Sequence, residues 1–305
     1  MKRNVLIFHL GALGDFVLTW PLALALGRLY PQSRIFYVTH GGKGQLAEKA
    51  LRLDSADIEG GWQSLFSANA SLPPPARKLL ESAHTVVTFL SDGKDTWADN
   101  VRRIAPGVNL VDLKPPTLNA PPIGEHASMY IERQLSPWPA LGTAVQQITR
   151  SITDRGVSGR ALGGNGILIH PGSGAALKCW PIDHFIELAR KLNEGGREVR
   201  WILGEVELER WPVEAIKRLE AIGTIAKPST PVELWELIGA AWLFIGNDSG
   251  PAHLAGMAGV PTVAIFGPTS AEIWHPLGPN VACVPHEDSK WPNLGEVMES
   301  VESII

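Results

Sequence analysis

Short apolar runs rich in β-branched residues alternate along the chain with longer segments in which polar and apolar residues mix. Within the runs the apolar residues are consecutive, which is typical of strands whose sheet is covered by helices on both faces. The runs predict strands at residues 5–8, 35–38, 86–90 and 109–113 in the first half, and at residues 167–170, 199–203, 224–226, 242–245, 262–266 and 281–284 in the second.

The clearest helix between these strands is predicted in the segment WPIDHFIELARKLNEGG. Its apolar residues recur with a helical period and form one stripe. Pro181 suits the first turn of a helix, and Asp183 complements the positive helix end. The glycine pair at 195–196 ends the segment.

Strand–helix alternation occurs in both halves of the chain, which predicts an α/β fold of two doubly wound domains. The length of 305 residues agrees, because it exceeds what one core usually supports. The region richest in Pro, Gly and Ser between elements lies between Ser136 and Gly166. We therefore predict one domain at residues 1–160 and another at residues 161–305.

Composition and charge exclude several functional classes. A net charge of -4 gives no indication of nucleic-acid binding. The two cysteines, Cys179 and Cys283, are far apart and have no metal or redox spacing, so no disulfide framework or metal site is expected and a reducing compartment is the simplest interpretation. Gly11, Gly14 and Asp15 interrupt the apolar N-terminal stretch, which predicts a strand, a turn and a helix instead of a signal peptide or transmembrane segment.

Three strand–helix junctions carry unusual polar residues, at the strand ends where open α/β sheets bind ligands. The first is HLGALGDFVLTWP, in which Gly11 and Gly14 permit a tight turn and Asp15 stands at a helix start. Its glycines do not form the G-x-G-x-x-G dinucleotide fingerprint. By itself, Asp15 is better explained as an N-cap carboxylate than by a catalytic role, because Asp is a preferred cap residue.

The second junction is IHPGSGAALKCWP, where a Gly/Ser turn with Ser173 and Gly174 precedes Lys178 and a helix. Turn amides, a helix N-terminus and a lysine together favour an anion. The Gly-Lys-Ser/Thr element of a Walker A loop is missing. A surface loop with a solvated lysine is the alternative interpretation.

The third junction is GNDSGPAHLAG, in which Asn247, Asp248 and Ser249 are predicted to turn the chain and cap a helix that begins at Gly250. His253 then projects from the first helical turn, where a histidine is often a structural hydrogen-bonder. A further buried strand ends near Thr269, which is unremarkable by itself.

Motifs of other enzyme classes are missing from the sequence. There is no H-E-x-x-H or Cys/His cluster for zinc and no G-x-S-x-G nucleophile elbow. No Asp-x-Asp stands in a strand-end turn, where it could hold a metal and a diphosphate. We therefore expect neither a metal nor another cofactor.

Together and in this order, the three junctions resemble glycosyltransferase family 9, the bacterial ADP-heptose:lipopolysaccharide heptosyltransferases. The resemblance spans most of the chain and is weakest over residues 41–164. It implies a GT-B fold of two Rossmann-like domains facing across a cleft, with the acceptor on the N-terminal domain and the nucleotide-sugar donor on the C-terminal domain. It also implies transfer in one inverting displacement, without a covalent intermediate or a strict metal requirement.

The resemblance also implies roles for individual residues. Asp15 matches the proposed general base, which takes the proton of the acceptor hydroxyl. Glu207, in LGEVELE, is the carboxylate expected near the ribose of the donor. The other residues implied to bind the donor, several of them at its diphosphate, are Ser173, Gly174, Lys178, Asp248, Ser249, Gly250, His253 and Thr269.

The partners implied by the resemblance are an ADP-sugar donor and a lipid-linked oligosaccharide acceptor at the inner membrane surface. The expected location is cytoplasmic, with peripheral attachment to the inner face of that membrane. The chain departs from the family where His9 replaces a frequent Arg, and where Cys283 alone remains of a Cys-rich segment. A different donor sugar, or a nucleotide-sugar binding module without transfer activity, therefore stays open, while the missing fingerprint disfavours a Rossmann oxidoreductase.

Overall fold

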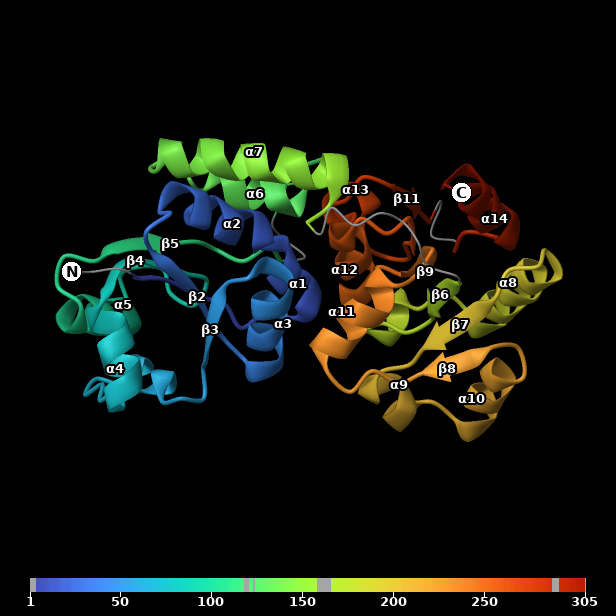
Figure 1. Ribbon diagram of the computed structural model, residues 1–305, viewed down its shortest axis with the longest axis horizontal. Coiled ribbons are helices and arrows are strands. Elements are labelled where there is room, and N and C mark those ends of the chain that lie inside the picture. Colours follow the sequence, from blue (N-terminus) through green and yellow to red (C-terminus); the bar gives the residue numbers. More distant parts are fainter. Residues whose placement is uncertain (1–3, 118–120, 123, 158–165, 287–290, 305) are drawn as a thin grey trace. The chain divides into compact units, whose positions relative to one another are not determined.

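The computed structural model describes residues 4–117, 121, 122, 124–157, 166–286 and 291–304, which form two compact units (Figure 1). The N-terminal unit comprises Met1–Pro121 and Ala127–Thr149, and the C-terminal unit comprises Pro122–His126 and Arg150–Ile305. Within the C-terminal unit, Nε2 of His126, the last residue of the short segment Pro122–His126, lies 2.9 Å from the backbone oxygen of His275. The boundary predicted at residue 160 lies outside the described residues.

The N-terminal unit contains a five-stranded parallel sheet of order β3-β2-β1-β4-β5. Its strands are β1 (Asn4–Phe8), β2 (Arg34–Thr39), β3 (Asp54–Asp57), β4 (Ala83–Thr88) and β5 (Asn109–Asp112). The helices that begin in this unit are α1 (Leu13–Leu18), α2 (Trp20–Leu29), α3 (Gly41–Leu51), the 3-10 helix η1 (Trp62–Phe66), α4 (Pro74–Glu81), α5 (Thr96–Ile104), α6 (Ala127–Arg133) and α7 (Pro139–Arg155).

The C-terminal unit contains a six-stranded parallel sheet of order β11-β10-β9-β6-β7-β8. Its strands are β6 (Ile167–His170), β7 (Val199–Ile202), β8 (Thr224–Ala226), β9 (Leu243–Asn247), β10 (Thr262–Ile265) and β11 (Val281–Val284). Its helices are the 3-10 helix η2 (Ala176–Lys178), α8 (Ile182–Glu194), α9 (Glu205–Arg210), α10 (Val213–Glu220), α11 (Pro231–Gly239), α12 (Gly250–Ala258), α13 (Ala271–Trp274) and α14 (Leu294–Ile304).

Every predicted strand is present within a few residues of its predicted bounds, which confirms two parallel-sheet α/β units. The predicted helix is α8, which begins one residue after Pro181 and ends at Glu194, with Gly195 as its C-cap residue. Strand β3 was not predicted. Its sequence, Asp-Ser-Ala-Asp, lies at the sheet edge and is half-exposed, so it has no apolar run to reveal it.

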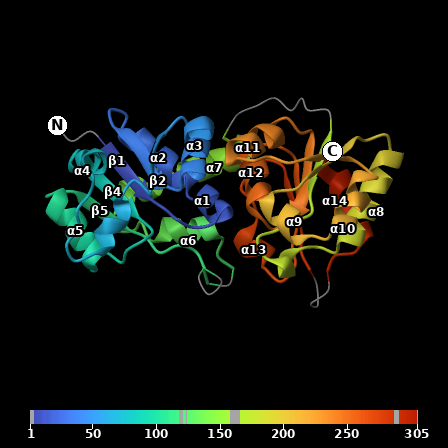
Figure 2. The ribbon, with the colours of Figure 1, turned by 90° about the horizontal axis from the view of Figure 1, so that it is seen from below.

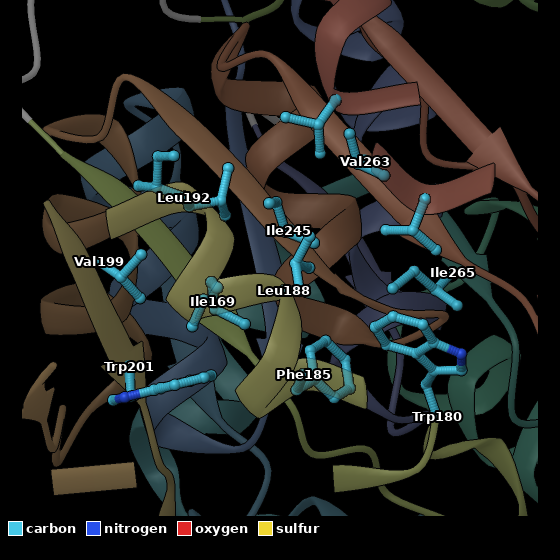
Figure 3. Packing of buried hydrophobic residues seen from close by; sticks show 14 of the residues in the cluster. Ile169, Trp180, Phe185, Leu188, Leu192, Val199, Trp201, Ile245, Val263 and Ile265 are labelled. Atoms are coloured by element: carbon cyan, nitrogen blue, oxygen red, sulfur yellow. The ribbon is translucent and has the colours of Figure 1, made fainter. Parts of the chain in front are cut away.

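Helices cover both faces of the sheet in the C-terminal unit. Helices α8, α10 and α14 pack on one face and α11 and α12 on the other (Figure 2). Figure 3 shows the first of these cores, in which side chains of α8 meet inward-facing residues of the central strands. Trp180 and Phe185 pack edge to face there, with ring centroids 5.0 Å apart. This packing fixes the start of α8 and therefore the loop that precedes it.

The N-terminal unit is built in the same way. Helices η1, α4 and α5 pack on one face of its sheet, where Phe8 contacts Trp62 and Trp97 edge to face. On the other face, Phe16 of α1 packs against Tyr37 of β2, with ring centroids 4.8 Å apart. The hydroxyl of Tyr37 is 2.8 Å from that of Thr19, so the turn between α1 and α2 is also fixed.

Candidate functional site

Each sheet has one point at which the strand order reverses, between β6 and β9 in the C-terminal unit and between β1 and β4 in the N-terminal unit. Loops that leave the carboxyl ends of such neighbouring strands diverge and leave a crevice for a ligand. The second and third sequence junctions follow β6 and β9, and the first follows β1. The topology therefore places all three motifs at reversal points.

Asn247 joins the two loops of the C-terminal crevice. It is the last residue of β9, and its side chain is fully buried. Its Nδ2 donates to the backbone oxygens of Pro171, at 2.8 Å, and Gly172, at 3.1 Å, while its Oδ1 accepts from the backbone N–H of Trp180 at 2.9 Å. The prediction that Asn247 turns the chain is therefore wrong, because it is a strand residue whose side chain holds the loop after β6.

Asp248 is the centre of a polar cluster. Its Oδ2 accepts from Lys178 Nζ at 2.8 Å and from Thr269 Oγ1 at 2.7 Å. Ser173 Oγ donates to its backbone oxygen at 3.2 Å. The structure thus brings together four of the predicted donor-site residues, which come from the loops after β6, β9 and β10.

Lys178 is a paired cation. Its side chain is 29% exposed, whereas that of Asp248 is 5% exposed. An ammonium group has three N–H donors, and the bond to Asp248 uses one of them. Lys178 is therefore not the solvated surface lysine of the alternative interpretation, and it is held with donors left over for an anion.

Helix α12 begins at Gly250 with Ser249 at its N-cap position, as predicted, but the Ser249 side chain makes no capping hydrogen bond. In the described part of the chain, the buried Oγ of Ser249 and Nδ1 of His253 have no hydrogen-bond partner. Burial lowers the pKa of His253 to about 4, although nearby Asp248 opposes the shift, so the imidazole is neutral near neutral pH. Buried polar atoms without partners are rare and call for an explanation, which a bound ligand would supply.

Glu207 lies beneath the loop after β6. Its carboxylate accepts from the backbone N–H of Gly204 at 2.9 Å, and a Cβ added to Gly172 would lie 2.0 Å from its Oε1. Burial alone raises the pKa of Glu207, but neighbouring His170 and backbone N–H groups outweigh it and hold the pKa below its usual range. Glu207 is thus a buried carboxylate in direct contact with the loop, and its contact with a ribose stays a prediction. Around Gly174, by contrast, a Cβ would meet nothing within 4 Å.

Asp15 lies in the first turn of α1, whose N-cap residue is Ala12. The N-cap interpretation of Asp15 is therefore wrong, because the residue lies three positions inside the helix. A Cβ added to Gly11 would lie 3.1 Å from Cβ of Asp15 and 2.8 Å from Cε1 of His9. The glycine therefore lets the turn close over both side chains.

Sequence reasoning missed Lys43, which lies in the first turn of α3. Its Nζ donates to the backbone oxygen of Gly11, and its charge interacts with that of Asp15. His9 is buried, and burial together with the Lys43 charge lowers the pKa of its imidazole to about 3. The signal that could have revealed Lys43 is the segment HGGKG, a glycine-rich junction directly after the second predicted strand.

Across the residues that the structure describes, no three His, Cys, Asp or Glu side chains gather in a way that could hold a metal ion. None of the helices in that part of the chain combines the length and the apolar character needed to cross a membrane.

The two units and their reversal-point loops define an α/β protein of two doubly wound parallel sheets, and comparisons identify the family. The sequence profile of glycosyltransferase family 9 (heptosyltransferase) matches residues 135–301, which is more than half of the chain. The chain belongs to this family, which confirms the resemblance found in the sequence. The family is one of transferases, as predicted.

Curated relatives match part of the chain. Lipopolysaccharide heptosyltransferase 3 of Escherichia coli is 30% identical over 163 residues, which are 50% of this chain and 48% of that protein. The protein of the same name in Escherichia coli strain K12 is 32% identical over 122 residues, which are 38% of this chain and 34% of that protein. The matches thus cover less than half the length of these relatives.

Solved structures match nearly the whole chain. A family 9 glycosyltransferase from Veillonella parvula has a TM-score of 0.68 and 19% identity over 99% of this chain and 97% of its own. The E. coli heptosyltransferase WaaC with ADP has a TM-score of 0.68 and 16% identity over 99% of this chain and 100% of its own. E. coli ADP-heptose LPS heptosyltransferase II has a TM-score of 0.65 and 18% identity over 99% of this chain and 98% of its own. These likenesses confirm the predicted GT-B fold class.

Proposed function

We propose that the chain is an inverting glycosyltransferase that moves a heptose or related sugar from an ADP-sugar to an acceptor of the lipopolysaccharide inner core. Membership of family 9 supports the class of reaction. The choice of donor is supported by the E. coli heptosyltransferase WaaC, which shares the fold and has been solved with ADP and with ADP-2-deoxy-2-fluoro heptose.

The observation that carries the proposal is the set of unpaired buried atoms beside the Asp248–Lys178 pair. Ser249 Oγ lies at the N-cap of α12, a nine-residue helix, and His253 Nδ1 belongs to its first turn. A helix N-terminus attracts anions, and a lysine held beside it adds a full positive charge. This combination suits the diphosphate of an ADP-sugar.

The same groups suit the leaving group. When the bond between the anomeric carbon and the diphosphate breaks, negative charge develops on the phosphate oxygen. Lys178, the N–H of Gly250 and the turn of Ser173 and Gly174 are the groups we assign to stabilise it, because fixed donors aimed at developing charge are among the strongest contributions to catalysis. Thr269 acts through Asp248, whose orientation it fixes.

Asp15 is the residue that we assign as general base. The acceptor oxygen forms its bond to the anomeric carbon from the side opposite the diphosphate, and its proton passes to the Asp15 carboxylate. A positioned base of this kind contributes about 10²–10⁴-fold to the rate. Glu207 is assigned to the donor ribose, a contact that requires its carboxylate to be reached past Gly172.

A lipid-linked oligosaccharide is the acceptor class of this proposal, which places the reaction in the cytoplasm at the inner face of the inner membrane. Release of ADP from a panel of nucleotide sugars, with and without a lipid A–core acceptor, tests both substrates. We expect release that requires an ADP-sugar and the acceptor together. Release from none of the donors, with or without acceptor, would overturn the proposal.

The variant Asp15→Asn separates a transferase from a module that only binds nucleotide sugars. We expect turnover to fall about 10²–10⁴-fold, with ADP affinity unchanged. Stability should fall only by about 0.3–1 kcal/mol, because the first turn of α1 loses one favourable charge and no cap. Asp99→Asn is the matched control, since it removes a carboxylate from the first turn of α5. Normal turnover of Asp15→Asn would exclude Asp15 as the base.

A further inference from the structure

Lys43 occupies a position that does not favour its own helix. It is the third residue of α3, and the first turn of a helix carries partial positive charge. A lysine there is electrostatically unfavourable, whereas Lys49, in the last turn of the same helix, is favourable. The contribution of Lys43 must therefore be sought in what its ammonium touches.

The first turn of α3 is held tightly in place. A Cβ added to Gly41 would lie 2.9 Å from Oδ2 of Asp57, and one added to Gly44 would lie 2.7 Å from Oγ of Ser55. Both contacts are with β3, so glycines let the helix approach this edge strand closely. The close approach fixes where the Lys43 side chain begins.

From there the half-buried Lys43 side chain reaches the turn after β1, where its Nζ donates to the backbone oxygen of Gly11. Asp15 lies against the same turn, because a Cβ added to Gly11 would lie 3.1 Å from Cβ of Asp15. Lys43 therefore joins the junction after β2 to the junction after β1.

The charged and titratable groups that the described contacts place around this turn include Lys43, Asp15 and His9, with Asp57 behind Gly41 and His40 at the N-cap of α3. Burial holds the pKa of Lys43 below its ordinary value, although the charge of Asp15 opposes this shift. His9 is neutral because burial and Lys43 lower its pKa to about 3. The positive charge that this turn receives from Lys43 is therefore not duplicated by His9.

We propose that Lys43 is the positioning residue of Asp15: its ammonium holds the Gly11 turn and stabilises the Asp15 carboxylate in its ionised form. This inference rests on the proposed function, in which Asp15 accepts the acceptor proton. An acceptor that covers the carboxylate removes water from it and favours its protonated form. The positive charge of Lys43 opposes that change, so Asp15 remains able to take the proton of the hydroxyl.

The test compares Lys43→Met, Lys43→Arg and the matched control Lys49→Met, which removes an exposed lysine from the same helix. The first measurement is a ¹³C NMR titration of the Asp15 carboxyl, identified by its loss in Asp15→Asn. An opposite charge nearby typically lowers a carboxyl pKa by 1–3, so we expect the midpoint to rise by about 1–3 pH units in Lys43→Met. Lys43→Arg and Lys49→Met should leave it near the wild-type value.

The second measurement is the pH profile of kcat with saturating ADP-sugar and acceptor. In Lys43→Met we expect the acidic limb of this profile to shift to higher pH by the same number of pH units as the Asp15 titration, with the KM for the donor unchanged. A uniform loss of kcat at every pH, with an unmoved Asp15 titration, would show that Lys43 only supports the fold and would overturn the inference.

The two measurements separate this inference from the proposed function. Suppose that wild-type protein transfers no sugar from any donor, but the midpoint of the Asp15 titration is higher in Lys43→Met than in wild type. The proposed function then fails and the coupling of Lys43 to Asp15 stands. If wild-type protein transfers sugar and the Asp15 titration does not move in Lys43→Met, the proposed function stands and the coupling of Lys43 to Asp15 fails.

Discussion

Removing the Lys178 charge should destabilise the C-terminal unit through the carboxylate that it leaves behind. In Lys178→Met, Asp248 keeps the hydrogen bond from Thr269 but loses its cation, while its side chain is 5% exposed. Breaking a fully buried pair in this way costs about 3–5 kcal/mol. Because Lys178 is 29% exposed, water compensates in part, and a charged hydrogen bond worth about 1.5–3 kcal/mol is the better guide.

That loss corresponds to a fall in Tm of roughly 3–12 °C for a unit of this size. The same loss of free energy in binding would lower the affinity for ADP roughly 10- to 150-fold. The unpaired Asp248 would add repulsion toward the phosphates. Adding Asp248→Asn removes that charge, and its amide oxygen still accepts from Thr269. We therefore expect the double variant to regain part of both the Tm and the ADP affinity that Lys178→Met loses.

Thermal unfolding and calorimetric titration with ADP on the two single variants, the double variant and wild type form a double-mutant cycle. Neighbours that share one interaction show coupling of about 0.5–3 kcal/mol. Lys191→Met, which removes an exposed lysine from the last turn of α8, is the control and should match wild type. A wild-type Tm and ADP affinity in Lys178→Met, or strictly additive effects in the cycle, would refute the reasoning.

Three further predictions concern the same unit. Asn247→Ala removes the hydrogen bonds to three buried backbone groups and should lower stability by about 2–4 kcal/mol in urea unfolding, at about 1 kcal/mol each; an unchanged midpoint would contradict this. Gly172→Ala should cost about 1–3 kcal/mol by overpacking against Glu207, and Gly174→Ala, in open space, should not. Since the folded pKa of His253, about 4, is below its unfolded value of 6.5, the native state binds fewer protons between them. The free energy of unfolding should thus fall as the pH drops from 6.5 to about 4, and it should fall more in wild type than in His253→Gln. Parallel curves of unfolding free energy against pH for the two proteins would exclude the effect.

The fold could largely be predicted from the sequence because its strands are buried on both faces. Such strands are continuous apolar runs, and those runs identified every strand except β3. Strand β3 pairs with β2 at the edge of the described sheet and is composed of Asp54, Ser55, Ala56 and Asp57, so neither its composition nor its periodicity distinguishes it from a loop. Its position nevertheless matters, because it supports the turn that carries Lys43.

The residues of the candidate site were predictable as separate motifs, but their partners were not. Lys178 and Asp248 are 70 residues apart, and their ion pair depends on strand order, which places β6 beside β9. A pattern of residue types contains no such register. For the same reason Lys43 was missed, since its relation to Asp15 arises only where two loops of the N-terminal unit meet.

Asn247, Asp248 and Ser249 show why adjacent polar residues can have unrelated roles. Successive side chains at the end of a strand point in different directions, so each of the three meets different neighbours. Asn247 points into the protein and satisfies the backbone of the loop after β6. Asp248 faces Lys178 and Thr269. Ser249, at the N-cap of α12, has an unpaired hydroxyl. Substituting the first should therefore alter stability, the second both stability and binding, and the third binding alone.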